Sequence, residues 1–200
     1  MSFFSRTSFQ PKRQFRFLVN FSQIADIDFM CTKAAKPSYK MGEGVSHKIL
    51  NHTFKFPGTV TWDDIKIDFI DAVEPNVGSK FYNMLVNSGY LQPTSFSNLL
   101  QGITKQSANA ALGTVRILQL DGGVMGPAPG LDPGASQGIS EGTSIIEEWT
   151  LNNAYIKDVA FGTTLDYAQP GIVSVGTTIT YDWASYNGQR QDYAGSATIV

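Results

Sequence analysis

One stretch near the end of the chain alternates without interruption between large and small side chains. Between residues 173 and 183, odd positions hold valine, threonine, isoleucine, tyrosine and tryptophan, whereas even positions hold serine, glycine, threonine and aspartate. Because successive side chains of a β-strand point to opposite faces, this period of two predicts a strand with one buried face and one small polar face. A strand of this kind needs a sheet with a core on one side, which favours a mainly β fold.

The same alternation recurs along the chain. Further strands are predicted in five segments: 14–21, 65–70, 115–120, 145–151 and 155–161. Residues 28–56 predict a long hairpin with its turn at 40–44, where two glycines flank Glu43.

Two segments have a helical period instead. Val77, Phe81 and Met84 predict one helix face, between Pro75 and Gly89. Similar spacing starts at residue 96 and predicts helix as far as residue 112. We therefore expect strands with one or two helices in the middle of the chain.

Residues 122–144 differ in composition from the rest. This segment contains seven glycines and three prolines, which predicts a long surface loop rather than core structure. The chain shows no internal repeat, and its 200 residues are expected to form a single domain over 1–200.

Charge is scarce and unevenly distributed. Charged residues make up 16% of the chain, against about 25% in an ordinary soluble protein. The net charge of −2 argues against a generic nucleic-acid binder. Residues 1–55 carry a net +6 and residues 56–200 a net −8. The two regions could attract each other between neighbouring molecules, pair within one chain, or simply face water.

The cellular compartment can be predicted from disulfides, membrane spans and signal peptides. Cys31 is the single cysteine, so no internal disulfide can form. No apolar run reaches the roughly 20 residues of a membrane span, and residues 1–6 do not resemble a signal peptide. We expect a protein of the reducing cytoplasm that does not enter a membrane.

No motif predicts an enzyme. Residues 134–138 match the Gly-x-Ser-x-Gly pattern, but they lie in the glycine-rich segment without the strand and helix that this motif requires. His47 and His52 are five positions apart and would point to opposite faces of one strand. The carboxylates of residues 63–71 alternate with apolar residues, as a solvated strand face requires. We therefore expect no catalytic residue, no metal and no cofactor.

Three longer stretches carry a resemblance. The first is residues 54–65, with the sequence Phe-Lys-Phe-Pro-Gly-Thr-Val-Thr-Trp-Asp-Asp-Ile, followed by a strand and the helix around Phe81-Tyr82-Asn83. The second is residues 104–113, beginning Thr-Lys-Gln-Ser-Ala. The third is residues 148–157, Glu-Trp-Thr-Leu-Asn-Asn-Ala-Tyr-Ile-Lys, continued by 178–184. Together they resemble the tail tube proteins of contractile-tailed, T4-like bacteriophages, across about residues 14–121 and 145–186. The 122–144 loop is longer than a minimal tube subunit needs.

The resemblance implies a fold and an assembly. It implies a tail-tube-like or type VI tube-like β-sandwich or barrel with one or two flanking α-helices. Six subunits would form a ring whose strands join into one continuous β-barrel around a lumen. Stacked rings would form the inner tail tube, the conduit for DNA ejection.

The resemblance also implies which residues serve the assembly. A hairpin arm at 33–58 would reach the next ring, and its bases would meet the acidic body there, through Lys33, Lys36, Lys40, Lys48 and Lys55. The polar face of residues 173–183 would line the lumen, through Ser174, Thr178, Thr180 and Asp182. DNA would pass along this wall without specific binding, because small, neutral or acidic groups do not hold a polyanion.

The implied partners are other tail components. They are the sheath protein, the baseplate tube initiator, the tail terminator and a tape-measure protein in the lumen, all in a virion tail assembled in the host cytoplasm. Two alternatives remain open at this point. One is the inner tube of a type VI or extracellular contractile injection system, and the other is a monomeric β-sandwich binding module.

Overall fold

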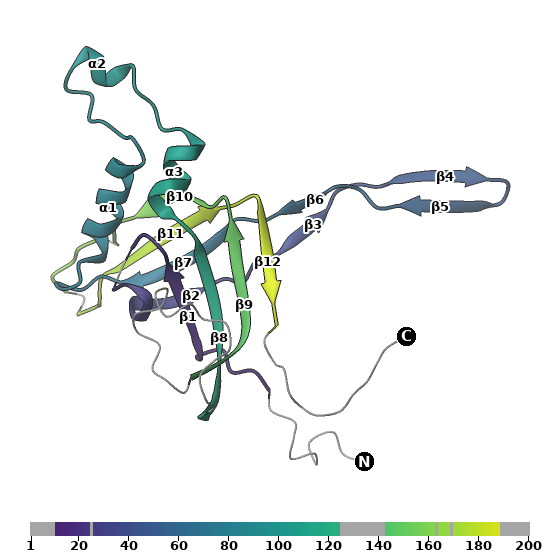
Figure 1. Ribbon diagram of the computed structural model, residues 1–200, viewed down its shortest axis with the longest axis horizontal. Helices are drawn as coiled ribbons and strands as arrows, with labels where there is room; N and C mark the ends of the chain where they lie inside the picture. Colours follow the sequence, from purple (N-terminus) through teal and green to yellow (C-terminus); the bar gives the residue numbers. More distant parts are fainter. Residues whose placement is uncertain (1–10, 25, 125–142, 163, 169, 189–200) are drawn as a thin grey trace.

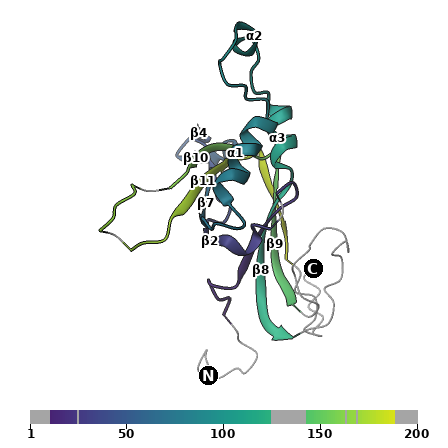
Figure 2. The same cartoon turned by 90° about the vertical axis from the view of Figure 1, so that its left-hand side faces the viewer.

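Two four-stranded antiparallel sheets face each other and form a β-sandwich (Figures 1 and 2). The computed structural model describes residues 11–24, 26–124, 143–162, 164–168 and 170–188. The first sheet contains, in spatial order, β1 (Phe17–Phe21), β8 (Val115–Val124), β9 (Thr143–Asn152) and β12 (Trp183–Asn187). The second sheet contains β10 (Tyr155–Ala160), β11 (Ser174–Thr180), β7 (Ile65–Ile70) and β2 (Cys31–Ala34). The predicted mainly β fold is confirmed.

The core lies between the sheets and is built by the alternation seen in the sequence. In β11, Val175, Thr177 and Ile179 are buried, and the residues between them are half-buried on the opposite face. Thr177 is tolerated in the core because its hydroxyl donates to the carbonyl of Ile67, at 3.1 Å. The first sheet contributes buried residues from three of its strands, including Val19 of β1. Strand β1, within the predicted strand 14–21, and strand β11 lie in different sheets.

Helices close one end of the sandwich, as Figure 2 shows for α1. Asn76 caps helix α1 (Val77–Asn87), because its side chain accepts a hydrogen bond from the Ser79 amide. The helix buries Val77, Phe81 and Met84. The predicted second helix is two separate helices, α2 (Phe96–Leu99) and α3 (Lys105–Leu112). A short 3-10 helix (Asp28–Met30) precedes β2.

The break between α2 and α3 has a local cause. Thr104 caps α3: its hydroxyl accepts from the Ser107 amide, and the Ser107 hydroxyl accepts from the Thr104 amide, both at 3.1 Å. This capping box starts a new helix at residue 105. Apolar residues of the α2 region, such as Phe96 and Leu100, are exposed rather than packed. Among the helices of the described residues, none is long and apolar enough to span a bilayer.

A long two-stranded arm extends from the second sheet, well away from the sandwich (Figure 1). Its inner part pairs β3 (Tyr39–Met41) with β6 (Val60–Trp62), and its outer part pairs β4 (Val45–Ile49) with β5 (His52–Phe56). We define the arm as residues 39–62. The chain reverses at residues 50–51, so the predicted turn at 40–44 is wrong, and the arm lies a few residues later than 33–58.

The glycines that suggested a turn instead allow the two chains of the arm to approach closely. A Cβ added to Gly44 would collide with the carbonyl of Phe56, and one added to Gly58 would lie 2.5 Å from the carbonyl oxygen of Gly42. The Gly42 amide donates to the Thr59 carbonyl at 2.8 Å, which holds the same junction together. Glycine is needed here for space rather than for a reversal.

Strand residues occupy both ends of the segment 122–144, which the sequence predicts to be a loop. Residues 122–124 belong to β8, and residues 143–144 belong to β9. Residues 125–142 lie outside the described residues.

The aromatic contacts of α1 give a test of the core. The ring of Phe81 is buried against Phe69 and Phe21, with ring centroids 5.3 and 6.5 Å away. We expect Phe81→Ala to lower the free energy of unfolding by about 3–5 kcal/mol, because it leaves a cavity between both sheets and the helix. The control Val86→Ala, on the exposed side of the same helix, should cost less than about 1 kcal/mol. Urea unfolding measures both, and equal costs would show that α1 does not complete this core.

Candidate functional site

The outer part of the arm has two chemically different faces. Cross-strand partners share a face, and the β4–β5 register pairs Val45 with Phe56, His47 with Phe54, and Ile49 with His52. These six residues form what we call the apolar face of the arm. The register also pairs Ser46 with Lys55 and Lys48 with Thr53, which form the basic face.

The apolar face is exposed in the single chain. Val45 is 72% exposed, Ile49 52%, Phe54 46% and Phe56 57%. An isolated two-stranded ribbon is marginally stable at best, and a continuous apolar surface of this kind marks an interaction site. The arm therefore has the chemistry that is typical of an interaction surface.

Both histidines lie on this apolar face, contrary to the prediction that they point to opposite faces. The prediction placed His47 and His52 on one strand, whereas the reversal at 50–51 places them on two paired strands. The His52 ring contacts the Phe54 ring edge-on, with centroids 5.0 Å apart.

The root of the arm is fixed to the sandwich by aromatic and ionic contacts. Tyr39 packs on Trp62 with ring centroids 5.5 Å apart, and Trp62 packs on the buried Tyr181 at 6.0 Å. Lys40 donates to Asp63 at 2.7 Å, and this hydrogen bond holds the pKa of Asp63 below its ordinary value. The arm therefore leaves the body in a defined direction.

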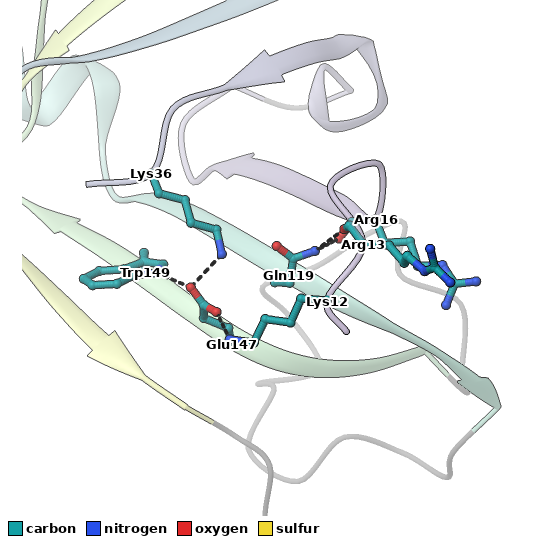
Figure 3. A network of polar contacts seen from close by, with 7 residues as sticks. All are labelled: Lys12, Arg13, Arg16, Lys36, Gln119, Glu147 and Trp149. Carbon is teal, nitrogen blue, oxygen red and sulfur yellow. Dashed lines mark hydrogen bonds and ion pairs between the residues drawn. The ribbon is translucent and has the colours of Figure 1, made fainter. Parts of the chain in front are cut away.

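A buried carboxylate ties the chain segments before the arm to the first sheet (Figure 3). Glu147 of β9 is 5% exposed and accepts from Lys12, from Lys36 at 2.8 Å and from the Trp149 indole at 2.6 Å. Lys36 lies between β2 and β3, so this contact fixes the connection that leads into the arm.

A neighbouring amide fixes the N-terminal segment. The side chain of Gln119, on β8 opposite Glu147, donates to the carbonyls of Arg13 and Arg16, at 2.8 and 2.6 Å (Figure 3). Around these groups lies a pocket of about 510 Å³ between the edge strands β1 and β2, lined by Lys12, Arg13, Lys33 and Lys36 together with neutral polar and apolar residues. Basic and buried groups thus meet at this edge of the sandwich.

Two opposed effects set the charge of Glu147. Burial alone would raise its pKa, but the hydrogen bonds from Lys12, Lys36 and Trp149 outweigh burial and lower the pKa to about 2. The carboxylate is therefore ionised throughout the physiological range. Sequence reasoning missed this residue, although a signal was present: Glu147 shares its parity in the strand with Trp149 and Leu151, on the buried face.

The five lysines predicted for the inter-ring interface are divided between the arm and the body. Lys33 lies in β2 and Lys36 binds Glu147, so both belong to the body. Lys40 lies at the root and is paired with Asp63. Lys48 and Lys55 lie on the basic face, in the outer part of the arm.

Three of the four predicted lumen residues share one face of β11. Ser174, Thr178 and Thr180 lie on the half-buried side of the strand, away from the core. Thr180 donates to Asp64 at 2.8 Å. Asp182 lies beyond the end of β11, where it binds Lys105 of α3 at 2.7 Å and Asn153 at 2.9 Å. These bonds lower the pKa of Asp182, and the residue is not part of the strand face.

The described residues contain no group of three or more histidine, cysteine, aspartate or glutamate side chains that could hold a metal ion. The Gly-x-Ser-x-Gly segment, 134–138, lies outside the described residues. Cys31 is half-buried, and burial raises the pKa of its thiol to about 12.

Comparison with known proteins identifies the architecture. No family model matches the chain, and no curated protein does so either. A chain of the anti-feeding prophage cap, described as a tube terminating cap, matches with a TM-score of 0.57 and 14% identity, over 94% of this chain and 99% of that one. A chain of the PVC sheath–tube complex, from an extracellular contractile injection system, matches with a TM-score of 0.54 and 12% identity, over 89% and 92%.

A chain of the anti-feeding prophage baseplate matches as well, with a TM-score of 0.55 and 14% identity, over 91% of this chain and 99% of that one. The chain has the tail-tube fold. At these identities the likeness extends to the fold, and it confirms the predicted fold class.

The Glu147 cluster predicts a pH dependence of stability. Its pKa is lowered on folding from the ordinary 4.5 to about 2, so the stabilisation is fully present above about pH 4.5 and is lost as the pH falls through 2. We expect Glu147→Gln to lower the free energy of unfolding at pH 6 by about 2–3 kcal/mol and to have a much smaller effect at pH 2.

Urea unfolding between pH 2 and pH 6 measures this difference. The exposed Glu43, changed to glutamine, serves as the control and should have little effect at any pH. A Glu147→Gln effect of the same size at pH 2 and pH 6 would contradict the ionic role of this carboxylate.

Proposed function

We propose that this protein is a structural subunit of the inner tube of a contractile tail or injection device. Its role is to build a conduit rather than to catalyse a reaction. The observation that carries the proposal is the arm, an exposed ribbon with an apolar face on a body that has the tail-tube fold. Such a surface is expected in a subunit that repeats along an axis.

Closure of the ring uses the free edges of the second sheet. Its strands run antiparallel in the order β10-β11-β7-β2, so β2 and β10, the two end strands, run in opposite directions. When β2 of one copy lies beside β10 of the next, the two strands are antiparallel, and the sheets join into one barrel. Closure in a ring of six leaves no free edge.

The outer face of this sheet then lines the lumen. Ser174, Thr178 and Thr180 supply small neutral groups along β11. Lys66 and Asp68 of β7 lie on the same face, opposite Thr178 and Gly176. Each lumen residue repeats six times around a ring, and the small neutral groups of β11 do not hold a polyanion such as DNA.

Stacking uses the arm, which contacts the next ring mainly through its apolar face. Lys48 and Lys55 on the basic face add attraction to acidic groups of that ring. Lys36 and Lys40 already bind Glu147 and Asp63 within one chain, and they contribute by holding the arm in position.

Two settings share this function. In a phage tail the tube conducts DNA, and its partners are the sheath, the baseplate initiator, the terminator and a tape-measure protein, in a virion tail assembled in the host cytoplasm. In an extracellular injection system the tube is built in the same way. The likeness to chains of the anti-feeding prophage and PVC particles supports the injection system as the alternative to a phage tail.

Substitutions on the two faces of the arm test the stacking proposal. We expect Phe54→Ser with Phe56→Ser to raise the protein concentration needed for tube assembly by at least about 100-fold, because each buried phenylalanine contributes about 1.5–3 kcal/mol. Sedimentation velocity and negative-stain micrographs measure assembly. The melting temperature should not change, since both side chains are exposed in the single chain.

The matched control changes the opposite face. Lys48→Gln with Lys55→Gln should shift assembly by less than about tenfold, and the shift should decrease at high salt. Tubes of normal length from the phenylalanine variant would contradict stacking through the apolar face. A larger effect from the lysine pair would make charge the main contact.

A further inference from the structure

The two histidines of the chain are diagonal neighbours on the surface that stacking would bury. His47 lies opposite Phe54, His52 lies opposite Ile49, and all four side chains belong to the apolar face. Neither ring closure nor stacking requires an ionisable group there, and phenylalanine or isoleucine would serve the packing equally well.

Within the described residues, the charged groups near these imidazoles are basic or distant. Lys48 and Lys55 lie on the opposite face of the same ribbon, and Glu43 lies at the inner end of β4. The His52 ring contacts the Phe54 ring, and His47 lies opposite Phe54 in the β4–β5 register. Every residue from 41 to 57 is exposed, so no other described element covers the imidazoles.

This setting makes the two protonation states unequal. A neutral imidazole can be buried beside phenylalanine, whereas an imidazolium without a carboxylate partner carries a large desolvation cost. Histidine is the side chain that ordinarily changes its charge between about pH 5 and pH 8.

We propose that arm-mediated stacking of this chain is gated by protons, with the arm docking on a second copy only while both His47 and His52 are neutral. This inference rests on the proposed function, because it assigns a regulator to the same contact. It predicts tubes that form near neutral pH and disassemble in a mildly acidic compartment.

The size of the effect follows from the number of histidines. Burying one imidazolium without a partner is expected to weaken association by about tenfold. Two imidazoles for each arm give a loss of about 100-fold in association between pH 7.5 and pH 5.5. The arm root is unaffected over this range, since Glu147, with a pKa of about 2, stays ionised.

The test compares the full-length protein with three variants at pH 7.5 and pH 5.5. The readout is the concentration needed for tube assembly, measured by light scattering and sedimentation, with circular dichroism as the check on folding. For the wild type, the concentration needed for tube assembly should be about 100 times higher at pH 5.5 than at pH 7.5. His47→Gln with His52→Gln should change less than about threefold, and His47→Gln alone should change about tenfold.

A matched control places two glutamines on the basic face, through Ser46→Gln with Thr53→Gln. It should keep the wild-type pH dependence. Wild-type tubes that are equally stable at both pH values would overturn the proton gate and leave stacking through the arm intact. Equal pH dependence in the wild type and the double histidine variant would also overturn the gate. Failure of the wild type to assemble at either pH would overturn the proposed function together with the gate.

Discussion

The exposed apolar face of the arm is the constraint on which the rest of the structure depends. Residues 41–57 extend from the sandwich without cover, and their phenylalanine, valine and isoleucine side chains face water in the single chain. A ribbon of this kind gains stability when another surface buries its apolar face. Its root must also be rigid, because a freely moving arm would lose more entropy on docking.

The uneven charge of the chain serves that rigidity. The basic first quarter suggested attraction between molecules, but several of its lysines bind acidic residues of the same chain. Lys36 binds Glu147, and Lys40 binds Asp63. Glu147 lies in the first sheet and Lys36 in the segment that leads to the arm, so one buried carboxylate connects the two layers. Lys48 and Lys55 lie on the basic face of the arm, outside these contacts.

The strands could be predicted from the sequence wherever one face is buried. The alternation in β11 and β7 gave the correct faces, because a half-buried strand requires a period of two. The arm carried no such signal of where it reverses. Its turn contains Leu50 with a φ of 53°, a conformation that leucine rarely adopts, while Gly44 and Gly58 mark a close approach of two chains. The faces of His47 and His52 were wrong for this reason.

The most direct test of the account is a cryo-electron microscopy map of the purified protein at neutral pH. The account predicts hollow tubes of stacked six-membered rings, with β2 paired to β10 of the next subunit, β11 facing the lumen, and each arm lying on the adjacent ring. A monodisperse particle with the 21.8 kDa mass of one chain, with its arm uncovered at high protein concentration, would contradict it.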